Sequence, residues 1–297
     1  MSFYEIEFPL AALSSDAVEA ALLEIGASSI TFVDRGDEPV LEPKPGEIRL
    51  WSDTLVRALF QASSDAALNL NRLASALGPH VSQTARVRAV KEQVWERAWL
   101  IGWKSLRFGR RLWVCPRAAE PPEDPEAVVV RLDPGLAFGT GTHPTTALCL
   151  QILDSMALAG KTLIDYGCGS GILGLAALKL GAEHVIAVDL DPQALLATRD
   201  NADRNAVAAR ITVQGIEAGL PTAHCVIANI LEGPLIDLAP KLTPACESGG
   251  YLLLSGILKT QAYSVKAAYA PGFDIVRVIE RDEWCCIYAR RRPQEPV

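Results

Sequence analysis

The sequence predicts an α/β protein with a doubly wound, mostly parallel sheet, preceded by a smaller N-terminal α+β domain. Two observations support this fold class. From about residue 127, short apolar runs alternate with helical patterns, which is typical of a parallel sheet covered on both faces. Before residue 91, the predicted elements follow the order β-α-β-β-α-β, as in a ferredoxin-like split unit. The 297 residues also suit two domains of about 150 residues each.

The predicted N-terminal domain covers residues 1–91 and contains four strands and two helices. Residues 3–8 alternate in hydrophobicity as a strand does, and residues 16–25 carry apolar side chains at helical spacing. The other predicted elements are strands over 29–34 and 84–90, a third strand that begins with residues 48–51, and a helix over 66–77. The pattern of residues 51–61 also fits a helix, which leaves the bounds of the third strand open.

Residues 92–104 are predicted to connect the two domains, mostly as a helix. Trp95, Trp99 and Trp103 recur every four residues there, so a helix would place them on one face. Packing between the domains explains such a stripe, and contact with a substrate explains it as well.

The predicted C-terminal domain covers residues 105–297. It opens with a strand over 107–115 and an acidic, Pro-rich loop. Predicted helices then cover 144–157, 172–180, 192–205, 234–242 and 258–269. Predicted strands cover 162–166, 184–189, 211–214, 225–229 and 251–255, with a closing antiparallel pair over 275–279 and 285–289. Ligands of such a sheet bind beyond the carboxyl ends of its central strands.

Composition excludes several classes of function. The formal net charge of −7 disfavours an extended phosphate-binding surface, because nucleic-acid affinity depends on Lys and Arg; it is compatible with a basic protein partner. The seven cysteines show no C-x-x-C spacing, so we expect no zinc site and a reducing compartment, the cytoplasm. The sequence shows neither a signal-peptide pattern nor an apolar run of about 18 residues.

The most informative motif is Ile-Asp-Tyr-Gly-Cys-Gly-Ser-Gly at residues 164–171, between a predicted strand and a predicted helix. Gly167 and Gly169 let a cofactor approach the backbone closely, and the helix N-terminus offers free N–H groups. The carboxylate of Asp165 would repel the pyrophosphate of a dinucleotide but attract the sulfonium and ammonium groups of S-adenosylmethionine. The motif therefore favours S-adenosylmethionine as the cofactor.

A second acidic residue suggests a ribose contact. Asp189 ends the predicted strand 184–189, where its carboxylate can accept hydrogen bonds from both ribose hydroxyls. Asp191 directly precedes Pro192 and suits a helix cap, which leaves Asp189 available. Residues 169–174 also fit the G-x-G-x-x-G pattern of dinucleotide-binding enzymes. An NAD-dependent oxidoreductase is therefore the alternative.

Asn229 ends the predicted strand 225–229 and is the candidate catalytic residue. Its carbonyl oxygen could hold an amine with the lone pair in line with a methyl group; a helix cap or a turn is the alternative. Methyltransferases that act on flat targets usually carry Pro-Pro-Tyr after this position, whereas this chain has Ile230, Leu231 and Glu232. An aliphatic amine is therefore the favoured target.

A glycine-containing loop over residues 132–146 precedes the first strand of the predicted cofactor domain. Thr142 or His143 is expected to cap the helix that begins at Pro144. The loop is placed to close over a site and exclude water, although an ordinary interdomain loop explains it too. We expect Thr145 beside the cofactor, with His143 as a secondary candidate.

In their order and spacing, residues 132–146, 164–173 and 229–231 resemble the bacterial ribosomal protein L11 methyltransferases of the PrmA type, and the resemblance spans nearly the whole chain. It implies a class I methyltransferase fold, a ferredoxin-like domain that holds the ribosomal protein, and transfer of methyl groups to lysine side chains and an N-terminal α-amine. It also implies cofactor contacts at Thr146, Gly167, Asp189 and Asn229.

The expectation is thus an S-adenosylmethionine-dependent protein methyltransferase acting on a large-subunit ribosomal protein in the cytoplasm. Asp165, Gly169 and Thr145 are added to the candidate cofactor contacts from the residues themselves. We expect a monomer without metal, membrane or direct nucleic-acid contact. The alternatives are a methyltransferase with another protein or small amine as target, an NAD-dependent oxidoreductase, and a cofactor-binding scaffold without activity.

Overall fold

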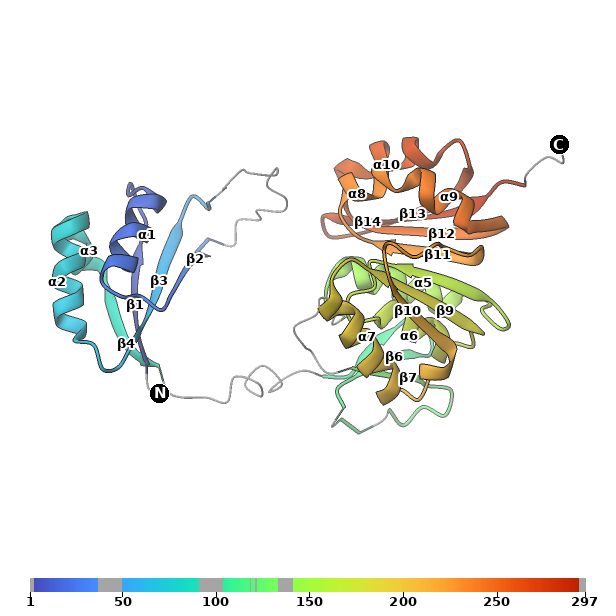
Figure 1. Cartoon of the computed structure of the whole chain (residues 1–297), viewed down its shortest axis with the longest axis horizontal. Helices are drawn as coiled ribbons and strands as arrows, with labels where there is room; N and C mark the ends of the chain where they lie inside the picture. Colours follow the sequence, from blue (N-terminus) through green and yellow to red (C-terminus); the bar gives the residue numbers. More distant parts are fainter. Residues whose placement is uncertain are drawn as a thin grey trace. The chain divides into compact units, whose positions relative to one another are not determined.

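The computed structural model describes residues 3–36, 50–90, 104–117, 119–120, 122–132 and 141–293. The chain divides into two compact units, residues 1–98 and 99–297 (Figure 1). The predicted connecting helix with its three tryptophans and most of the glycine-containing loop lie outside the described residues. None of the helices in the described part is long and apolar enough to cross a membrane.

The N-terminal unit is a four-stranded antiparallel sheet with helices on one face (Figure 1). The strand order is β2-β3-β1-β4, with β1 (Phe3–Pro9), β2 (Ser29–Asp34), β3 (Thr54–Gln61) and β4 (Arg86–Val90). The helices are α1 (Ser15–Glu24), α2 (Ala66–Leu77) and the short α3 (Pro79–Thr84). This is the predicted element order with one additional short helix.

The third strand lies later in the chain than the sequence pattern suggested. The prediction began it at 48–51, whereas β3 runs from Thr54 to Gln61. In β3, every second side chain from Thr54 to Phe60 is buried. This period of two is that of a strand with one covered face, so residues 51–61 are not helical.

The C-terminal unit contains a seven-stranded sheet of order β10-β9-β8-β11-β12-β14-β13. The first five of these strands pair in parallel, and β14 pairs antiparallel with both β12 and β13. Their bounds are β8 (Thr162–Tyr166), β9 (His184–Asp189), β10 (Ile211–Gly215), β11 (Ala223–Asn229), β12 (Cys246–Leu258), β13 (Phe273–Arg281) and β14 (Trp284–Arg291). The predicted mostly parallel sheet with a closing antiparallel pair is confirmed.

Helices cover both faces of this sheet, as the doubly wound fold requires (Figure 1). The side chains of α5 (Pro144–Ser155), α6 (Ile172–Lys179) and α7 (Pro192–Arg204) join the core on one face. Those of α8 (Glu232–Asp237), α9 (Ala239–Ala245) and α10 (Ala262–Tyr269) join the core on the other. Successive residues of the parallel strands alternate between the two cores, so these strands are buried on both faces.

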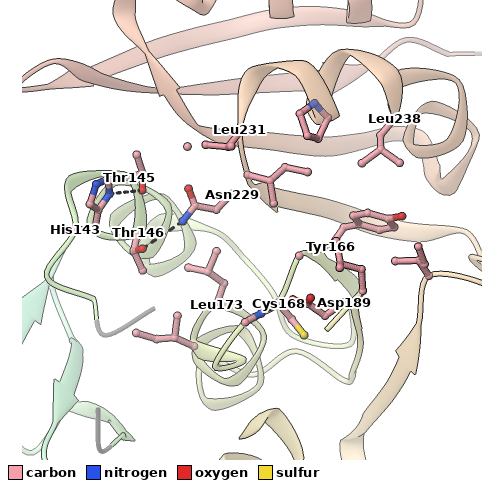
Figure 2. Close-up of a pocket in the computed structure, with 18 of the residues that line it drawn as sticks. His143, Thr145, Thr146, Tyr166, Cys168, Leu173, Asp189, Asn229, Leu231 and Leu238 are labelled. Carbon is pink, nitrogen blue, oxygen red and sulfur yellow. Dashed lines mark hydrogen bonds between the residues drawn. The ribbon is translucent and has the colours of Figure 1, made fainter. Parts of the chain in front are cut away.

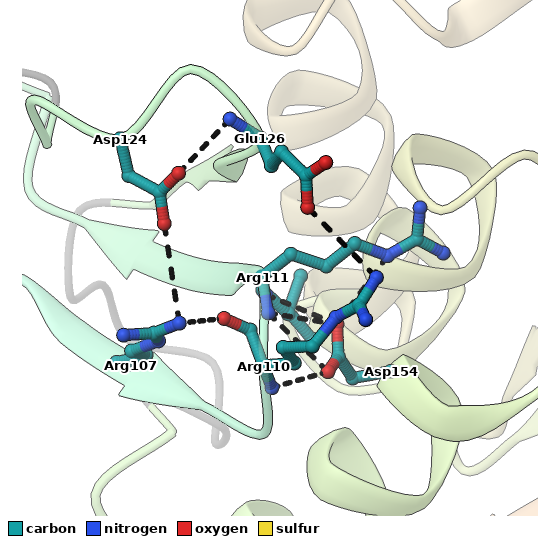
Figure 3. A network of polar contacts seen from close by, with 7 residues as sticks. Arg107, Arg110, Arg111, Asp124, Glu126 and Asp154 are labelled. Atoms are coloured by element: carbon teal, nitrogen blue, oxygen red, sulfur yellow. Dashed lines mark hydrogen bonds and ion pairs between the residues drawn. The ribbon is translucent and has the colours of Figure 1, made fainter.

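The segment before the large sheet is a hairpin rather than the single strand predicted over 107–115. It consists of β5 (Leu106–Phe108) and β6 (Leu112–Cys115), and β6 also pairs in parallel with β7 (Val128–Arg131). Gly109 adopts a φ of +72° at the turn, and a Cβ there would collide with the carboxylate of Asp154. This carboxylate, from α5, accepts the backbone N–H groups of Arg110, Arg111 and Leu112 (Figure 3).

Candidate functional site

A pocket of about 660 Å³ lies at the carboxyl ends of the central strands of the large sheet (Figure 2). The strand ends supply Tyr166 from β8, Asp189 from β9 and Asn229 from β11. The N-terminal turn of α5 supplies Thr145 and Thr146. Residues that the sequence suggested from four distant segments therefore line one pocket.

The glycine turn forms the floor of the pocket. The N–H groups of Gly167 and Cys168 donate to the carbonyl oxygen of Val188 at 2.7 and 3.0 Å, which ties the end of β8 to β9. Gly167 has a φ of +76°, and a Cβ there would collide with the adjacent side chain of Ile230. Both the backbone conformation and the available space therefore require glycine at this position.

Helix α7 holds the same turn from below. The hydroxyl of Thr198 donates to the carbonyl oxygen of Gly169 at 3.0 Å, and the Asn201 amide donates to that of Ser170 at 2.9 Å. Thr198 and Asn201 are both buried. Sequence reasoning missed them; the available signal was a pair of polar residues three positions apart on the inner face of the predicted helix 192–205.

Asp189 and Asp191 have different roles, and Asp191 caps the helix, as the sequence predicted. Asp191 accepts the N–H of Gln193 at 2.9 Å and caps α7. The two carboxylate oxygens of Asp189 accept the N–H groups of Gly169 at 2.9 Å and Asp191 at 3.0 Å. These backbone contacts hold the Asp189 carboxylate at the pocket wall, beside the glycine turn.

Asp165 differs from its expected position beside the cofactor. Its side chain is 1% exposed and is absent from the pocket lining. The carboxylate instead accepts the N–H of Gly174 at 2.8 Å, in the first turn of α6. The reason is the alternation of a strand: Tyr166 faces the pocket, so Asp165 faces the opposite side. Burial, and then the nearby charge of Asp189, raises the pKa of Asp165 to about 7.

Asn229 and Thr146 are in direct contact across the pocket (Figure 2). The amide nitrogen of Asn229 donates to the Thr146 hydroxyl at 3.2 Å. The carbonyl oxygen Oδ1 of Asn229 is buried and, among the described residues, has no hydrogen-bond partner. A buried acceptor without a partner is costly, so this oxygen is suited to accept a hydrogen bond from a ligand.

His143 caps α5 at the edge of the pocket. Its Nδ1 lies 2.7 Å from the Thr145 hydroxyl and accepts the Thr145 N–H at 3.4 Å. The imidazole ring meets the Trp284 ring edge-on, with centroids 4.7 Å apart. Burial lowers the pKa of His143, which keeps the ring uncharged at neutral pH. Of the two predicted capping residues, His143 is the one that caps.

The pocket also contains apolar residues that sequence reasoning did not single out as site residues. They include Leu190, Ile216, Leu238 and Trp284. Leu190 and Ile216 directly follow the ends of β9 and β10, so the signal was an apolar residue just beyond a predicted parallel strand. Within the described part of the chain, no group of three or more His, Cys, Asp or Glu side chains could hold a metal ion.

Comparison with known proteins decides the family. Residues 2–292 match the family model described as ribosomal protein L11 methyltransferase (PrmA). The chain belongs to this family. A ribosomal protein L11 methyltransferase from Sodalis glossinidius is 50% identical over 294 residues, which are 98% of this chain and 100% of the relative. One from Escherichia coli O81 is 48% identical over 302 residues, again 98% of this chain and all of the relative.

A solved structure of a family member agrees with the fold. The ribosomal protein L11 methylase from Lactobacillus delbrueckii subsp. bulgaricus is 30% identical, with a TM-score of 0.58 over 64% of this chain and 100% of that one. The chain is therefore an enzyme, a methyltransferase whose methyl donor is S-adenosylmethionine. Both the resemblance and the choice of cofactor are confirmed, and the NAD-dependent alternative is set aside.

Proposed function

We propose that this chain transfers methyl groups from S-adenosylmethionine to lysine side chains and the N-terminal α-amine of ribosomal protein L11. Family membership supports the substrate protein. The observation that carries the chemistry is the buried, unpartnered Oδ1 of Asn229 at the end of β11. An amine N–H group is a donor that would satisfy it.

The pocket fits the cofactor in size and in the order of its polar groups. Its volume of about 660 Å³ lies within the usual range of ligand sites. The sheet order β9-β8-β11 places Asp189 and Asn229 on opposite sides of the Gly167 turn. We infer that the ribose hydroxyls are held by Asp189 and that the methionine part lies over Gly167 and Gly169, toward Asn229.

Thr145 and Thr146 complete the proposed cofactor contacts at the reactive end. Thr146 is 1% exposed and already accepts a hydrogen bond from Asn229. This contact fixes the orientation of the Asn229 amide and directs Oδ1 away from Thr146. We assign Asn229 as the catalytic residue and Thr146 as the group that holds it.

The bound cofactor supplies an electrophilic methyl group, and the chain has to deliver a neutral amine in line with it. A free lysine has a pKa of about 10.4, and transfer into a closed site lowers it because burial disfavours the charged form. The Asn229 oxygen then accepts one N–H group and points the nitrogen lone pair at the methyl carbon. Positioning of this kind can supply roughly 7–11 kcal/mol of a reaction barrier.

Substrate recognition is proposed to belong to the N-terminal domain, residues 1–91, with residues 92–104 as the connector and 105–297 as the catalytic domain. The described residues that line the pocket fall between 143 and 284, which leaves the first domain available for another purpose. A separate antiparallel sheet with its own apolar core suits a docking module for a protein.

We further propose that the enzyme acts in the cytoplasm as a monomer and contacts L11 itself rather than nucleic acid. A ribosomal protein substrate and seven cysteines without a disulfide support a reducing compartment. The net charge of −7 supports a basic protein as the partner.

A methyl-transfer assay tests the proposal directly. The purified chain is incubated with S-adenosylmethionine and L11, and the product is analysed by mass spectrometry. We expect methyl groups on lysine side chains and on the α-amine. L11 from cells that lack the chain should carry none of them, and unchanged methylation in those cells would contradict the proposal. Methylation of a different ribosomal protein alone would keep the enzyme class and overturn the substrate.

A further inference from the structure

Lys241 joins two walls of the cofactor pocket without lining the pocket itself. It lies in α9, and its ammonium donates to the carbonyl oxygen of Ile216 at 2.9 Å and to the hydroxyl oxygen of Tyr166 at 3.3 Å. The ammonium also lies 5.3 Å from the centre of the Tyr166 ring, within the range of a cation–π contact. Both of its partners line the pocket.

These contacts lie at the end of the pocket away from the reacting amine. In the sheet order β10-β9-β8, the strand that carries Asp189 lies between the strands that lead to Ile216 and Tyr166. Figure 2 shows Tyr166 and Asp189 on the opposite side of the pocket from Asn229. With the ribose at Asp189, this end is where the purine base has to lie.

The turn that carries Ile216 is held by one backbone hydrogen bond, from the Ala218 N–H to the carbonyl oxygen of Gly215 at 3.2 Å, and by side-chain contacts. The amide of Gln214 donates to the carbonyl oxygen of Gly219 at 3.1 Å, which closes the base of the turn. Lys241 supplies the anchor in its middle. Ile216 is 37% exposed and therefore gains little fixation from packing. Among the described residues no carboxylate forms an ion pair with Lys241. No such ion pair therefore competes with its contacts to Tyr166 and Ile216.

We propose that Lys241 is a positioning residue for the nucleoside end of the cofactor. It holds the Tyr166 ring and the Ile216 turn at the separation that admits the adenine base between an aromatic and an aliphatic wall. It acts through these two residues rather than by touching the cofactor. The proposal rests on the placement of the ribose at Asp189. It adds that Lys241 sets the width of the neighbouring site for the adenine base.

The test measures binding of S-adenosylhomocysteine and of adenosine by calorimetry. Lys241→Met removes the donors and keeps the length of the side chain. We expect both dissociation constants to rise severalfold, because without Lys241 the two walls have to be ordered when the ligand binds, and this ordering reduces the binding free energy. Lys241→Arg retains donors and should stay near the wild-type values. Lys179→Met is the matched control, because Lys179 also donates to a backbone carbonyl, that of Asn205 at 3.3 Å, away from the pocket lining.

Kinetics separate positioning from a structural role. In Lys241→Met, the KM for S-adenosylmethionine should rise while kcat at saturating cofactor stays unchanged, because Asn229 and Thr146 do not contact Lys241. Tyr166→Phe removes the hydroxyl, one of the two acceptors of the Lys241 ammonium. It should therefore also weaken adenosine binding. The effects of the two substitutions should be less than additive, since they share one contact.

Dissociation constants for Lys241→Met equal to those for Lys179→Met would overturn the proposal, as would a loss of kcat with unchanged affinity. If Lys241→Met does not fold, unchanged adenosine binding by Tyr166→Phe overturns it instead. Asp189→Ala separates the role of Lys241 from the placement of the ribose at Asp189. Weakened binding in Asp189→Ala but not in Lys241→Met refutes only the role of Lys241. Unchanged binding in Asp189→Ala refutes the ribose placement on which that role rests.

Discussion

At the scale of single residues, neighbouring positions of one strand have opposite surroundings. Tyr166 faces the pocket, whereas Asp165 is buried beneath the first turn of α6 and accepts the Gly174 N–H. The acid before the glycine turn thus stabilises the helix that follows it. Its raised pKa, about 7, has a consequence for stability that can be measured.

Asp165→Asn should flatten the dependence of stability on pH. Burial raises the folded-state pKa of Asp165 from its ordinary value of 3.8 to about 7, so unfolding releases the proton at pH values between these two. The contribution of this group is therefore fully present below about pH 4 and is lost as the pH rises through about 7. Urea denaturation at several pH values should show the wild-type free energy of unfolding falling, relative to Asp165→Asn, between pH 5 and 7. A constant difference would show that Asp165 stays ionised.

Asp189→Ala should weaken cofactor binding without unfolding the protein. The substitution removes charge-assisted hydrogen bonds to the ribose, so the dissociation constant of S-adenosylhomocysteine should rise about tenfold or more. Calorimetry measures the change. Asp191→Asn is the matched control, because it removes a carboxylate two residues away yet keeps a side chain that caps α7. Equal affinity in the two variants would place the ribose elsewhere.

Asn229→Ala should reduce methyl transfer more than cofactor affinity. The lost hydrogen bond orients the amine, so kcat at saturating S-adenosylmethionine should fall by at least about tenfold. The dissociation constant of S-adenosylhomocysteine, measured on the same sample, should change less. Near-normal turnover in this variant would show that Asn229 is only a binding or capping residue.

At the scale of elements, the β5–β6 hairpin is held by a single buried carboxylate. The Asp154 side chain is 4% exposed and accepts three successive backbone N–H groups of the turn (Figure 3). The guanidinium of Arg111 lies 3.8 Å from the same carboxylate. The hairpin also lies close to the site, because a Cβ added to Gly141, two residues before His143, would meet the Phe108 ring at 3.3 Å.

Asp154→Ala should lower the free energy of unfolding of the C-terminal unit. The turn N–H groups would lose their acceptor while partly buried, at a cost of about 1–3 kcal/mol. Glu126→Ala is the control, since Glu126 is 73% exposed and its ion pair with Arg110 belongs to a class worth little. Denaturant titration of both variants measures the difference. Equal free energies of unfolding in the two variants would show that apolar contacts alone stabilise the hairpin.

At the scale of the whole molecule, the chain divides into two units with separate cores. The pocket-lining residues that the structure describes belong to the second unit. A division of this kind allows one unit to bind the cofactor while the other binds the protein substrate, and it makes the two properties separable by truncation.

Removal of residues 1–91 should leave cofactor binding intact and impair methylation of L11. The remaining fragment keeps the seven-stranded sheet, its helices and the complete pocket. We expect calorimetry to show near-normal affinity for S-adenosylhomocysteine and the assay to show a large loss of activity on intact L11. Full activity of a soluble fragment would contradict the docking role of the first domain.

Sequence patterns alone determined the two-part α/β organisation, the glycine turn and the positions of Asp189 and Asn229. Each depends on local signals: alternation of strand and helix, glycines at a turn, and polar residues at strand ends. The pairing of residues distant in sequence was decided by the tertiary structure. Ile216 and Trp284 reach the pocket because β10 lies beside β9 and β14 pairs with β12. Lys241 contacts two of the lining residues, Ile216 and Tyr166, from α9. Strand alternation places Asp165 and Tyr166 on opposite sides of the sheet, but only the tertiary structure showed that α6 packs over the Asp165 side and buries its carboxylate.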